Sequence, residues 1–236
     1  KETLKCISLS RNWEYNVAWI DTSTSASKLG RSIVSRGYFL QKNESELSFL
    51  KNKSIIKNLP NIFPTFLMSG LFIKILNFFF FSFSKSEKKV SSIDAFFYPL
   101  DKVNNWNIVY GKKGFISYQC SLPLINSYKS IYEILKILKK NKIYSFVSVL
   151  KSMRKNNNFL SFGQKGFTLV FDFPIYSGVH SVLNKIDNVV LNYKGKIYLS
   201  KDSRVSKEKF SKINNEFDNK AFKSFRKKIN YHFSSI

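Results

Sequence analysis

The chain has 236 residues, which suits one large domain or two small ones, and its 44% hydrophobic content excludes wholesale disorder. The formal net charge is +24, but most of the basic residues are Lys, whereas Arg is the usual reader of base edges. We therefore expect lysine-covered solvated faces and no specific nucleic-acid binding. An anionic membrane or a phosphorylated ligand stays open as a partner.

Cysteine and histidine usage argues against a metal site. The sequence holds two cysteines, Cys6 and Cys120, with no CxxC pair, and His180 and His232 lie far apart. This pattern predicts a reducing, cytoplasmic location. The first residues, KETLKCISLSRNWEYN, lack both the apolar core of a secretory signal and an initiating Met, which is consistent with a start inside a longer protein.

The first half of the chain predicts two strands and one strongly apolar segment. Residues 14–21 and 33–40 have strand-like alternation and are joined by a Ser/Thr-rich loop. Residues 64–85, PTFLMSGLFIKILNFFFFSFSK, are the most apolar stretch. Lys74 near its middle and several scattered polar residues disfavour a membrane span, which needs about 20 mostly apolar residues. We expect a core-packing helix or a pair of strands, and peripheral contact with a membrane remains an alternative.

The second half predicts an α+β fold. Strands are expected at 115–123, 143–151, 167–173 and 196–200, and amphipathic helices at 127–140 and 178–194, with Gly195 as the cap of the second helix. This β-α-β-β-α-β order is typical of a ferredoxin-like unit, an antiparallel sheet with helices on one face and the other face free. Residues 206–229 predict a further helical segment with Phe and Ile anchors.

The chemistry that the residues offer is a polar sheet face. The chain has no GxSxG, P-loop or GxGxxG motif, and no carboxylate pair is placed by spacing on one element. Ser117 and Gln119 alternate along one strand and therefore share a face, as do Thr168 and Val170 on another, and Lys151 ends a third. Pattern alone leaves two interpretations open, a solvated sheet face and a site for ligand hydroxyls or phosphate.

Several motifs, in the same order, resemble the C-terminal half of FAD-linked oxidases of the vanillyl-alcohol oxidase superfamily. The branch that acts on sugar lactones and polyprenyl-phosphate sugars is the most similar. The resemblance covers nearly the whole chain and rests on the segments YNVAWID (15–21), LGRSIVSRG (29–37), YPLDKVNNWNIVYGKKGF (98–115), LSFGQKGFTLVFDFP (160–174) and GKIYLSKDSR (195–204).

This resemblance implies a substrate-binding cap domain over residues 1–195 and a segment, residues 196–236, that returns to a flavin-binding domain. It implies an FAD-dependent oxidoreductase that oxidises a secondary alcohol of a sugar by hydride transfer. Lys201 is the expected catalytic residue, beside the flavin and the substrate hydroxyls, with Tyr198 also near the cofactor. An ammonium there would stabilise negative charge on the reduced ring.

The resemblance also assigns the substrate-binding residues and the partners. Ser117, Thr168 and Val170 depart from the Gln, Asn and Cys expected there, which argues against an identical sugar and against thiol-directed inhibition. Implied partners are a lipid-linked or free sugar, a short-chain reductase and a membrane surface. The expected lining of the sugar site is Trp19, Tyr110, Ser117, Gln119, Lys151, Thr168 and Val170.

The flavin-binding domain of the family has no counterpart in this sequence, so the chain alone should not hold FAD tightly. A partial sequence, a split gene and a degenerate remnant each explain this. The alternative function is a non-enzymatic, basic, membrane-peripheral binding module.

Overall fold

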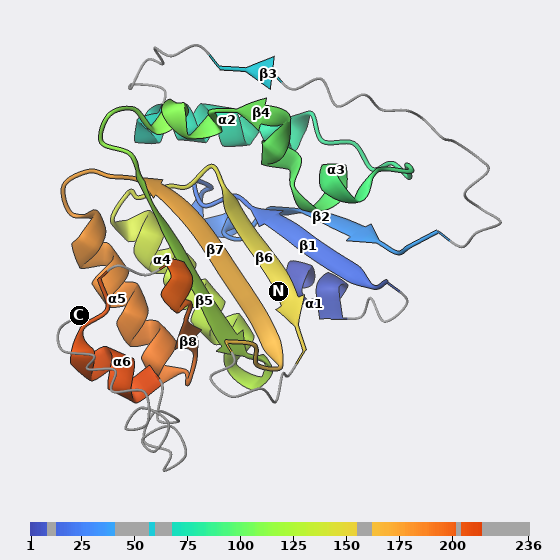
Figure 1. Ribbon diagram of the computed structural model, residues 1–236. Helices are drawn as coiled ribbons and strands as arrows, with labels where there is room; N and C mark the ends of the chain where they lie inside the picture. Colours follow the sequence, from blue (N-terminus) through green and yellow to red (C-terminus); the bar gives the residue numbers. More distant parts are fainter. Residues whose placement is uncertain (9–12, 41–56, 60–67, 155–161, 202–203, 214–236) are drawn as a thin grey trace, which may run out of the picture.

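The computed structural model describes residues 1–8, 13–40, 57–59, 68–154, 162–201 and 204–213 (Figure 1). The strands are β1 (Tyr15–Ile20), β2 (Ser32–Gly37), β3 (Lys57–Asn58), β4 (Val103–Asn104), β5 (Phe115–Pro123), β6 (Ser148–Met153), β7 (Gly166–Pro174) and β8 (Lys196–Ile197). The α-helices are α1 (Glu2–Ser8), α2 (Gly70–Ser82), α3 (Ile93–Phe97), α4 (Ser127–Lys140), α5 (Val179–Asn192) and α6 (Lys207–Ile213). Short 3-10 turns occur at η1 (Ala26–Lys28), η4 (Pro99–Lys102), η5 (Trp106–Tyr110), η6 (Leu124–Asn126) and η7 (Leu199–Lys201).

The main sheet has six strands in the order β2-β1-β6-β7-β5-β8, and every neighbouring pair is antiparallel. The run β5-α4-β6-β7-α5-β8 is the predicted β-α-β-β-α-β unit, and its strand order places β7 between β5 and β6. The N-terminal hairpin β1–β2 extends this unit at β6. The α+β prediction is therefore confirmed.

One face of the sheet is packed by α1, α4 and α5. Helix α4 buries the stripe Ile131, Ile134, Leu135 and Leu138, and α5 buries Val179, Val182, Leu183, Ile186, Val189 and Val190. Both stripes follow the helical period that predicted them. They pack against side chains that β5, β6 and β7 direct to the same face, and together these form one core cluster.

Three predicted strands have different limits in the structure. Residues 143–147 are an irregular connection, because the Ser145 hydroxyl donates to the main-chain oxygens of Val147 and Asp172, and its N–H donates to Thr22 Oγ1. These bonds replace a sheet ladder until Ser148. The 196–200 prediction shortens to β8, after which the chain turns into η7. The second strand ends at Gly37 rather than at residue 40.

The predicted glycine cap of α5 has a different role. The left-handed residue that ends α5 is Lys194, with φ of 56°, and the Gly195 N–H donates to the Val190 carbonyl at 2.7 Å. A Cβ on Gly195 would meet Ser121 O at 2.6 Å and Val190 Cγ1 at 2.8 Å. Glycine is needed here for the close approach of α5 to β5, not for its backbone angles.

Within the apolar segment 64–85, residues Gly70–Ser82 form α2, and a helix is one of the two expected forms. Ser69 accepts a hydrogen bond from the Phe72 N–H and so begins the helix. The expected packing of this segment into the core is wrong for most of the helix. Its buried residues are Ile73 and Asn77, several of its large apolar side chains are exposed, and none of its residues belongs to the main core cluster. Of the described helices, none is both long and apolar enough to cross a membrane. The predicted C-terminal helical segment begins with α6, and residues 214–229 lie outside the described part of the chain.

Candidate functional site

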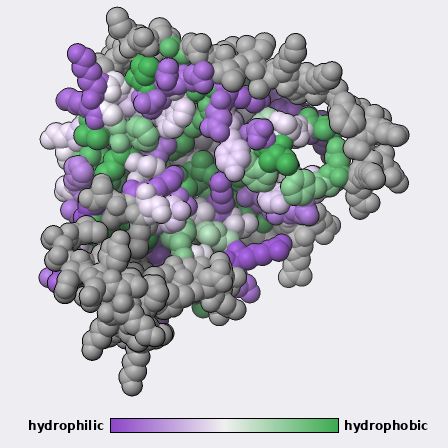
Figure 2. Space-filling model, viewed as in Figure 1, coloured by the Kyte–Doolittle hydropathy of each residue, from purple (hydrophilic) through white to green (hydrophobic). Residues whose placement is uncertain are grey.

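The sheet face that α1, α4 and α5 leave uncovered carries the candidate site; we call it the open face. It is defined by the side chains at 117, 119 and 121 of β5, 168, 170 and 172 of β7, 149 and 151 of β6, and 15, 17 and 19 of β1. The strand register places Gln119, Val170, Val149 and Trp19 opposite one another in one row across four strands. Figure 2, in the same view as Figure 1, shows hydrophilic and hydrophobic side chains intermixed over the molecule.

A second row of the open face joins Ser121, Thr168 and Lys151. Thr168 is buried, and its hydroxyl donates to Cys120 O at 2.9 Å. Gln119 Nε2 donates to Thr168 Oγ1 at 3.2 Å, which fixes the amide along the sheet. The amide N–H is used in this contact, and the carbonyl oxygen of the Gln119 side chain can accept a hydrogen bond from a ligand hydroxyl.

A third row pairs Ser117 with Asp172. Asp172 is 6% exposed, and its Oδ1 has no hydrogen-bond partner among the described residues. Burial raises the pKa of this carboxyl, and a hydrogen bond from Ser117 and the charge of Lys201 oppose that rise. Keeping Asp172 charged therefore costs free energy, and its Oδ1 can accept a proton or a further hydrogen bond.

Tyr110 lies beside Asp172. It reaches the open face from η5, where its ring stacks on Phe115 with centroids 4.6 Å apart. Burial, and then the charge of Asp172, raise the pKa of its phenol, so Tyr110 stays protonated and can donate a hydrogen bond.

Lys201 is brought to the same face from the other side by η7. The turn is anchored because the Tyr198 N–H donates to Gln119 O at 2.9 Å, and the Lys201 N–H donates to Tyr198 O. Burial lowers the pKa of the Lys151 ammonium, and the positive charge of Lys201 lowers it further. Two ammonium groups therefore face one region of the sheet, with Asp172 as the neighbouring carboxylate.

The loop before β7 closes one end of the open face. Gln164 Nε2 donates to the Ser121 main-chain and hydroxyl oxygens at 2.9 and 3.0 Å, and Ser121 Oγ donates to Phe162 O. The Phe162 ring packs on Tyr198 with centroids 4.8 Å apart. Tyr198 therefore lies at a rim of the site.

Trp19 forms the opposite wall, under α2. Its indole N–H donates to Phe146 O at 2.8 Å, and its ring meets Phe80 edge-on at 4.9 Å. With the N–H already used, Trp19 can offer a ligand an apolar surface but no hydrogen bond.

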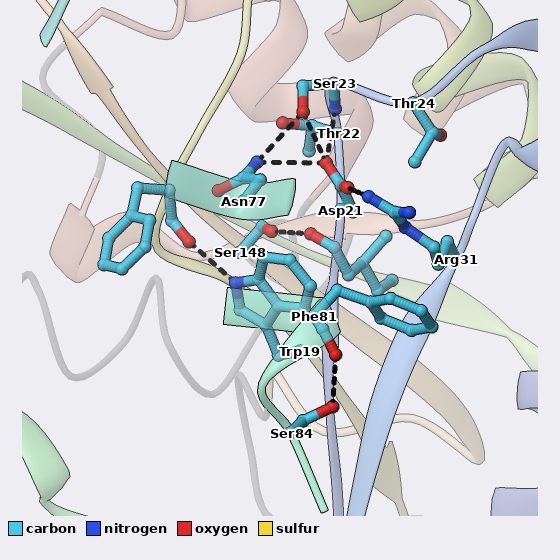
Figure 3. Close-up of polar contacts among 12 residues, drawn as sticks. Trp19, Asp21, Thr22, Ser23, Thr24, Arg31, Asn77, Phe81, Ser84 and Ser148 are labelled. Atoms are coloured by element: carbon cyan, nitrogen blue, oxygen red, sulfur yellow. Dashed lines mark hydrogen bonds and ion pairs between the residues drawn. The ribbon is translucent and has the colours of Figure 1, made fainter. Parts of the chain in front are cut away.

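Polar contacts hold α2 in this position (Figure 3). Asn77 Nδ2 donates to the buried Asp21 Oδ1 at 3.0 Å, Ser23 donates to the same oxygen from its N–H and its hydroxyl, and Arg31 pairs with Oδ2 at 2.6 Å. The Arg31 guanidinium also lies 4.4 Å from the centroid of the Phe81 ring. The β1–β2 connection and α2 therefore meet at one carboxylate.

The structure thus gathers the sequence-predicted residues on one face. Tyr110 and Lys201 adjoin it. Six others share it by strand register: Trp19, Ser117, Gln119, Lys151, Thr168 and Val170. Asp172 was missed by the sequence reasoning, although a signal existed. A carboxylate inside the buried run FTLVFDF, in the same alternation as Thr168 and Val170, is costly unless it is used.

The described residues contain no cluster of three or more side chains suited to hold a metal ion. What the open face offers instead is a shallow apolar floor at Val149 and Val170, hydroxyl and amide groups beside it, and two ammonium groups. That combination suits a polyhydroxylated ligand, with or without a phosphate, and a planar ring laid over the floor.

In the comparison with known proteins, no family model matches the chain. The chain is 32% identical over 208 residues to the decaprenylphosphoryl-beta-D-ribose oxidase of Mycolicibacterium smegmatis, a match that covers 84% of this chain. It spans 45% of that relative, in the C-terminal half. This similarity supports the resemblance that the sequence motifs indicated.

Proposed function

We propose that this chain, as a relative of the C-terminal half of that oxidase, is the substrate-binding part of an FAD-dependent oxidoreductase. It would oxidise a secondary alcohol of a sugar or a polyprenyl-phosphate sugar by hydride transfer to the flavin. The observation that carries the proposal is the open face, where strand register and η7 bring the polar residues and Lys201 together beside an apolar floor.

The residues present fit the ring side of FAD rather than its phosphates. The floor at Val149 and Val170 suits a flat ring, and Lys201 adjoins it, whereas the sequence has no glycine-rich loop for a pyrophosphate. Bound FAD would supply the hydride acceptor. A separate flavin-binding domain would hold most of the cofactor, and residues 196–236 would form the segment that returns to it.

The chain's own residues would bind and orient the sugar. Gln119 would accept from a substrate hydroxyl, and Tyr110 would donate to a substrate oxygen. Lys201 would donate a hydrogen bond to the carbinol oxygen and hold it in place, and the carboxylate of Asp172, whose Oδ1 has no partner among the described residues, would accept the hydroxyl proton. Lys151 would bind a phosphate on a lipid-linked substrate. A short-chain reductase would consume the resulting ketone.

The direct test is a chimera in which this chain replaces the corresponding C-terminal half of the M. smegmatis relative. A yellow protein whose flavin absorbance is bleached by decaprenylphosphoryl-ribose, or by a panel of sugars and sugar lactones, would support the proposal. Lys201→Met should slow bleaching by roughly a hundredfold or more, on the scale of a lost charged group in the transition state. Lys165→Met, on the loop before β7, should leave the rate unchanged. Retained flavin with no bleaching by any of these substrates would refute the proposed reaction.

A specific observation favours a second function, a non-enzymatic module that binds a membrane surface. Helix α2 exposes large apolar side chains, with Phe83 75% and Leu71 72% exposed. The lysines Lys85, Lys88 and Lys89 follow it directly. Apolar side chains next to a basic stretch suit an anionic lipid interface.

Vesicle co-sedimentation separates the two functions. The peripheral-module proposal expects the chain to sediment with vesicles that contain phosphatidylglycerol, and expects Phe79→Ser with Phe83→Ser to abolish this. Lys201→Met should have no effect on sedimentation. If the wild-type chain did not bind such vesicles, the peripheral-module proposal would be refuted, and the oxidase proposal would be unaffected.

A further inference from the structure

A hollow outside the open face gathers positive charge. It has a volume of about 390 Å³, within the range of about 300–1,000 Å³ for small-molecule sites. The β1–β2 connection, α2, α4 and the α4–β6 connection form its walls. Its lining consists of Ser23, Thr24, Ser25, Arg31, Lys74, Phe78, Lys139 and Tyr144.

Three cationic side chains converge on this hollow, and its lining of described residues includes no carboxylate. Asp21 lies behind Arg31, but its two oxygens are already engaged by Ser23, Asn77 and Arg31. Because Asp21 already pairs with Arg31, the charges left without a carboxylate are those of Lys74 and Lys139. Two like charges beside one space repel each other, so a negative group placed between them is favourable.

Buried polar atoms in the lining also lack a partner. Thr24 is 8% exposed, and its hydroxyl oxygen makes no hydrogen bond with any described residue. The same is true of Arg31 Nε, whose neighbouring Nη2 binds Asp21. Figure 3 shows Thr24 and Arg31 on the same side of Asp21, with no contact drawn from the Thr24 hydroxyl. A generally lysine-rich surface does not explain a buried hydroxyl and a buried guanidinium N–H that both lack partners.

The lysines are held in place with donors to spare. Lys139 Nζ donates to Thr24 O at 3.0 Å, which uses one of its three N–H groups. Lys74 Nζ lies 5.0 Å from the centroid of the Tyr144 ring. Both ammonium groups are therefore positioned by contacts that leave N–H groups for another acceptor.

We propose that this hollow is a binding site for a phosphate group, held by Lys74, Lys139, the Arg31 Nε–H and the Thr24 hydroxyl. A phosphate dianion matches the two ammonium charges of Lys74 and Lys139 and has enough oxygens to accept from all four donors. The proposal does not depend on the oxidase function, because no residue of the hollow belongs to the open face. Inorganic phosphate and the headgroup of a lipid both present such a group.

In the test, the full chain is titrated with inorganic phosphate at constant ionic strength, and binding is measured by calorimetry. Saturable 1:1 binding is expected. Lys74→Met with Lys139→Met should weaken it by at least about tenfold, because each removes a charge-assisted hydrogen bond. Thr24→Val should weaken it by about threefold to tenfold and should fold normally, since it removes a buried hydroxyl that has no partner. Lys129→Met with Lys136→Met, an equal charge change on the exposed surface of α4, should alter the affinity by less than about twofold.

A second arm uses phosphatidylcholine vesicles with and without phosphatidic acid. Sedimentation that requires phosphatidic acid and is lost in the Lys74/Lys139 variant, without saturable binding of inorganic phosphate, would identify a lipid headgroup as the source. Saturable binding of inorganic phosphate would show that the free ion suffices. The proposal is overturned if neither arm shows binding, or if Lys129→Met with Lys136→Met weakens binding as much as Lys74→Met with Lys139→Met.

Discussion

Arg204 holds the buried carboxylate of Asp187 with two hydrogen bonds of 2.7 Å, one from each terminal nitrogen. Asp187 lies on α5 and is fully buried, and Lys209 of α6 adds a bond of 3.1 Å. The Arg204 guanidinium also lies 5.3 Å from the centroid of the Tyr118 ring. Because Arg204 follows η7 closely in sequence, this pair fixes the course of the chain that carries Lys201 to the open face.

Removing Arg204 should therefore destabilise the fold. In Arg204→Met the buried Asp187 keeps only Lys209 as its cationic partner, and breaking a buried pair in this way costs about 3–5 kcal/mol. We expect a loss of roughly 3 kcal/mol in the free energy of unfolding, measured by urea denaturation. Lys209→Met is the matched control and should cost only about 1 kcal/mol. Equal losses in the two variants would contradict this account of the pair.

The buried Asp172 predicts a pH dependence of stability. Its pKa is raised from 3.8 by burial, so the native protein binds this proton more tightly than the unfolded chain does. The contribution of Asp172 to the free energy of unfolding is therefore greatest below pH 3.8 and falls as the pH rises through the raised pKa. Asp172→Asn removes this titration, so its stability relative to the parent chain should improve as the pH rises over that window.

Denaturation curves at several pH values check this trend. Ser117→Ala removes a hydrogen bond that lowers the pKa of Asp172, and should extend the unfavourable slope to higher pH. Asp101→Asn, at an exposed position, serves as the charge-matched control and should not reproduce the trend. A constant difference between Asp172→Asn and the parent across the range would show that this carboxyl does not titrate as inferred.

The proximity of Lys201 to Lys151 predicts a change in the pKa of Lys151. Lys201 disfavours the charged form of its neighbour, so Lys201→Met should raise the pKa of Lys151 towards its ordinary value. Burial is the larger cause of the lowered pKa, and a part of the depression should therefore persist. NMR titration of the labelled lysine side chain gives the measurement. Lys165→Met should leave the pKa of Lys151 unchanged. If Lys201→Met also left it unchanged, the charge of Lys201 would not act on Lys151 as inferred.

The order of elements in the second half could be predicted because each has a strong local signal. The stripes of α4 and α5 have clear helical periods, and β5 and β7 lie close to their predicted limits. The boundaries that differ depend on distant partners. No local pattern shows that Ser145 bonds with Thr22 and Asp172, contacts that keep residues 143–147 out of the strand.

The candidate site was predictable only in part for a similar reason. Alternation along one strand assigns Ser117 and Gln119 to the same face, but the register between strands decides that Val149 and Trp19 share it. The proximity of Asp172 to Tyr110 and Lys201 depends on η5 and η7, two short turns with little sequence signature. The hollow at Thr24 joins three stretches distant in sequence, at residues 23–31, 74–78 and 139–144, and left no sequence signal.

The end of α5 predicts opposite effects for two adjacent residues. Gly195→Ala places a Cβ 2.6 Å from Ser121 O, against backbone that cannot move without shifting β5, so it should cost about 1–3 kcal/mol. Lys194→Gly should instead stabilise the protein by up to about 1 kcal/mol, because Lys194 occupies a left-handed conformation that glycine adopts without strain. Thermal and urea unfolding of both variants give the two signs. Gly114→Ala is the control for backbone angle alone, since Gly114 has φ of 71° and open space at its Cβ. If Gly195→Ala cost no more than Gly114→Ala, the close packing of α5 on β5 would not be the reason for glycine at 195.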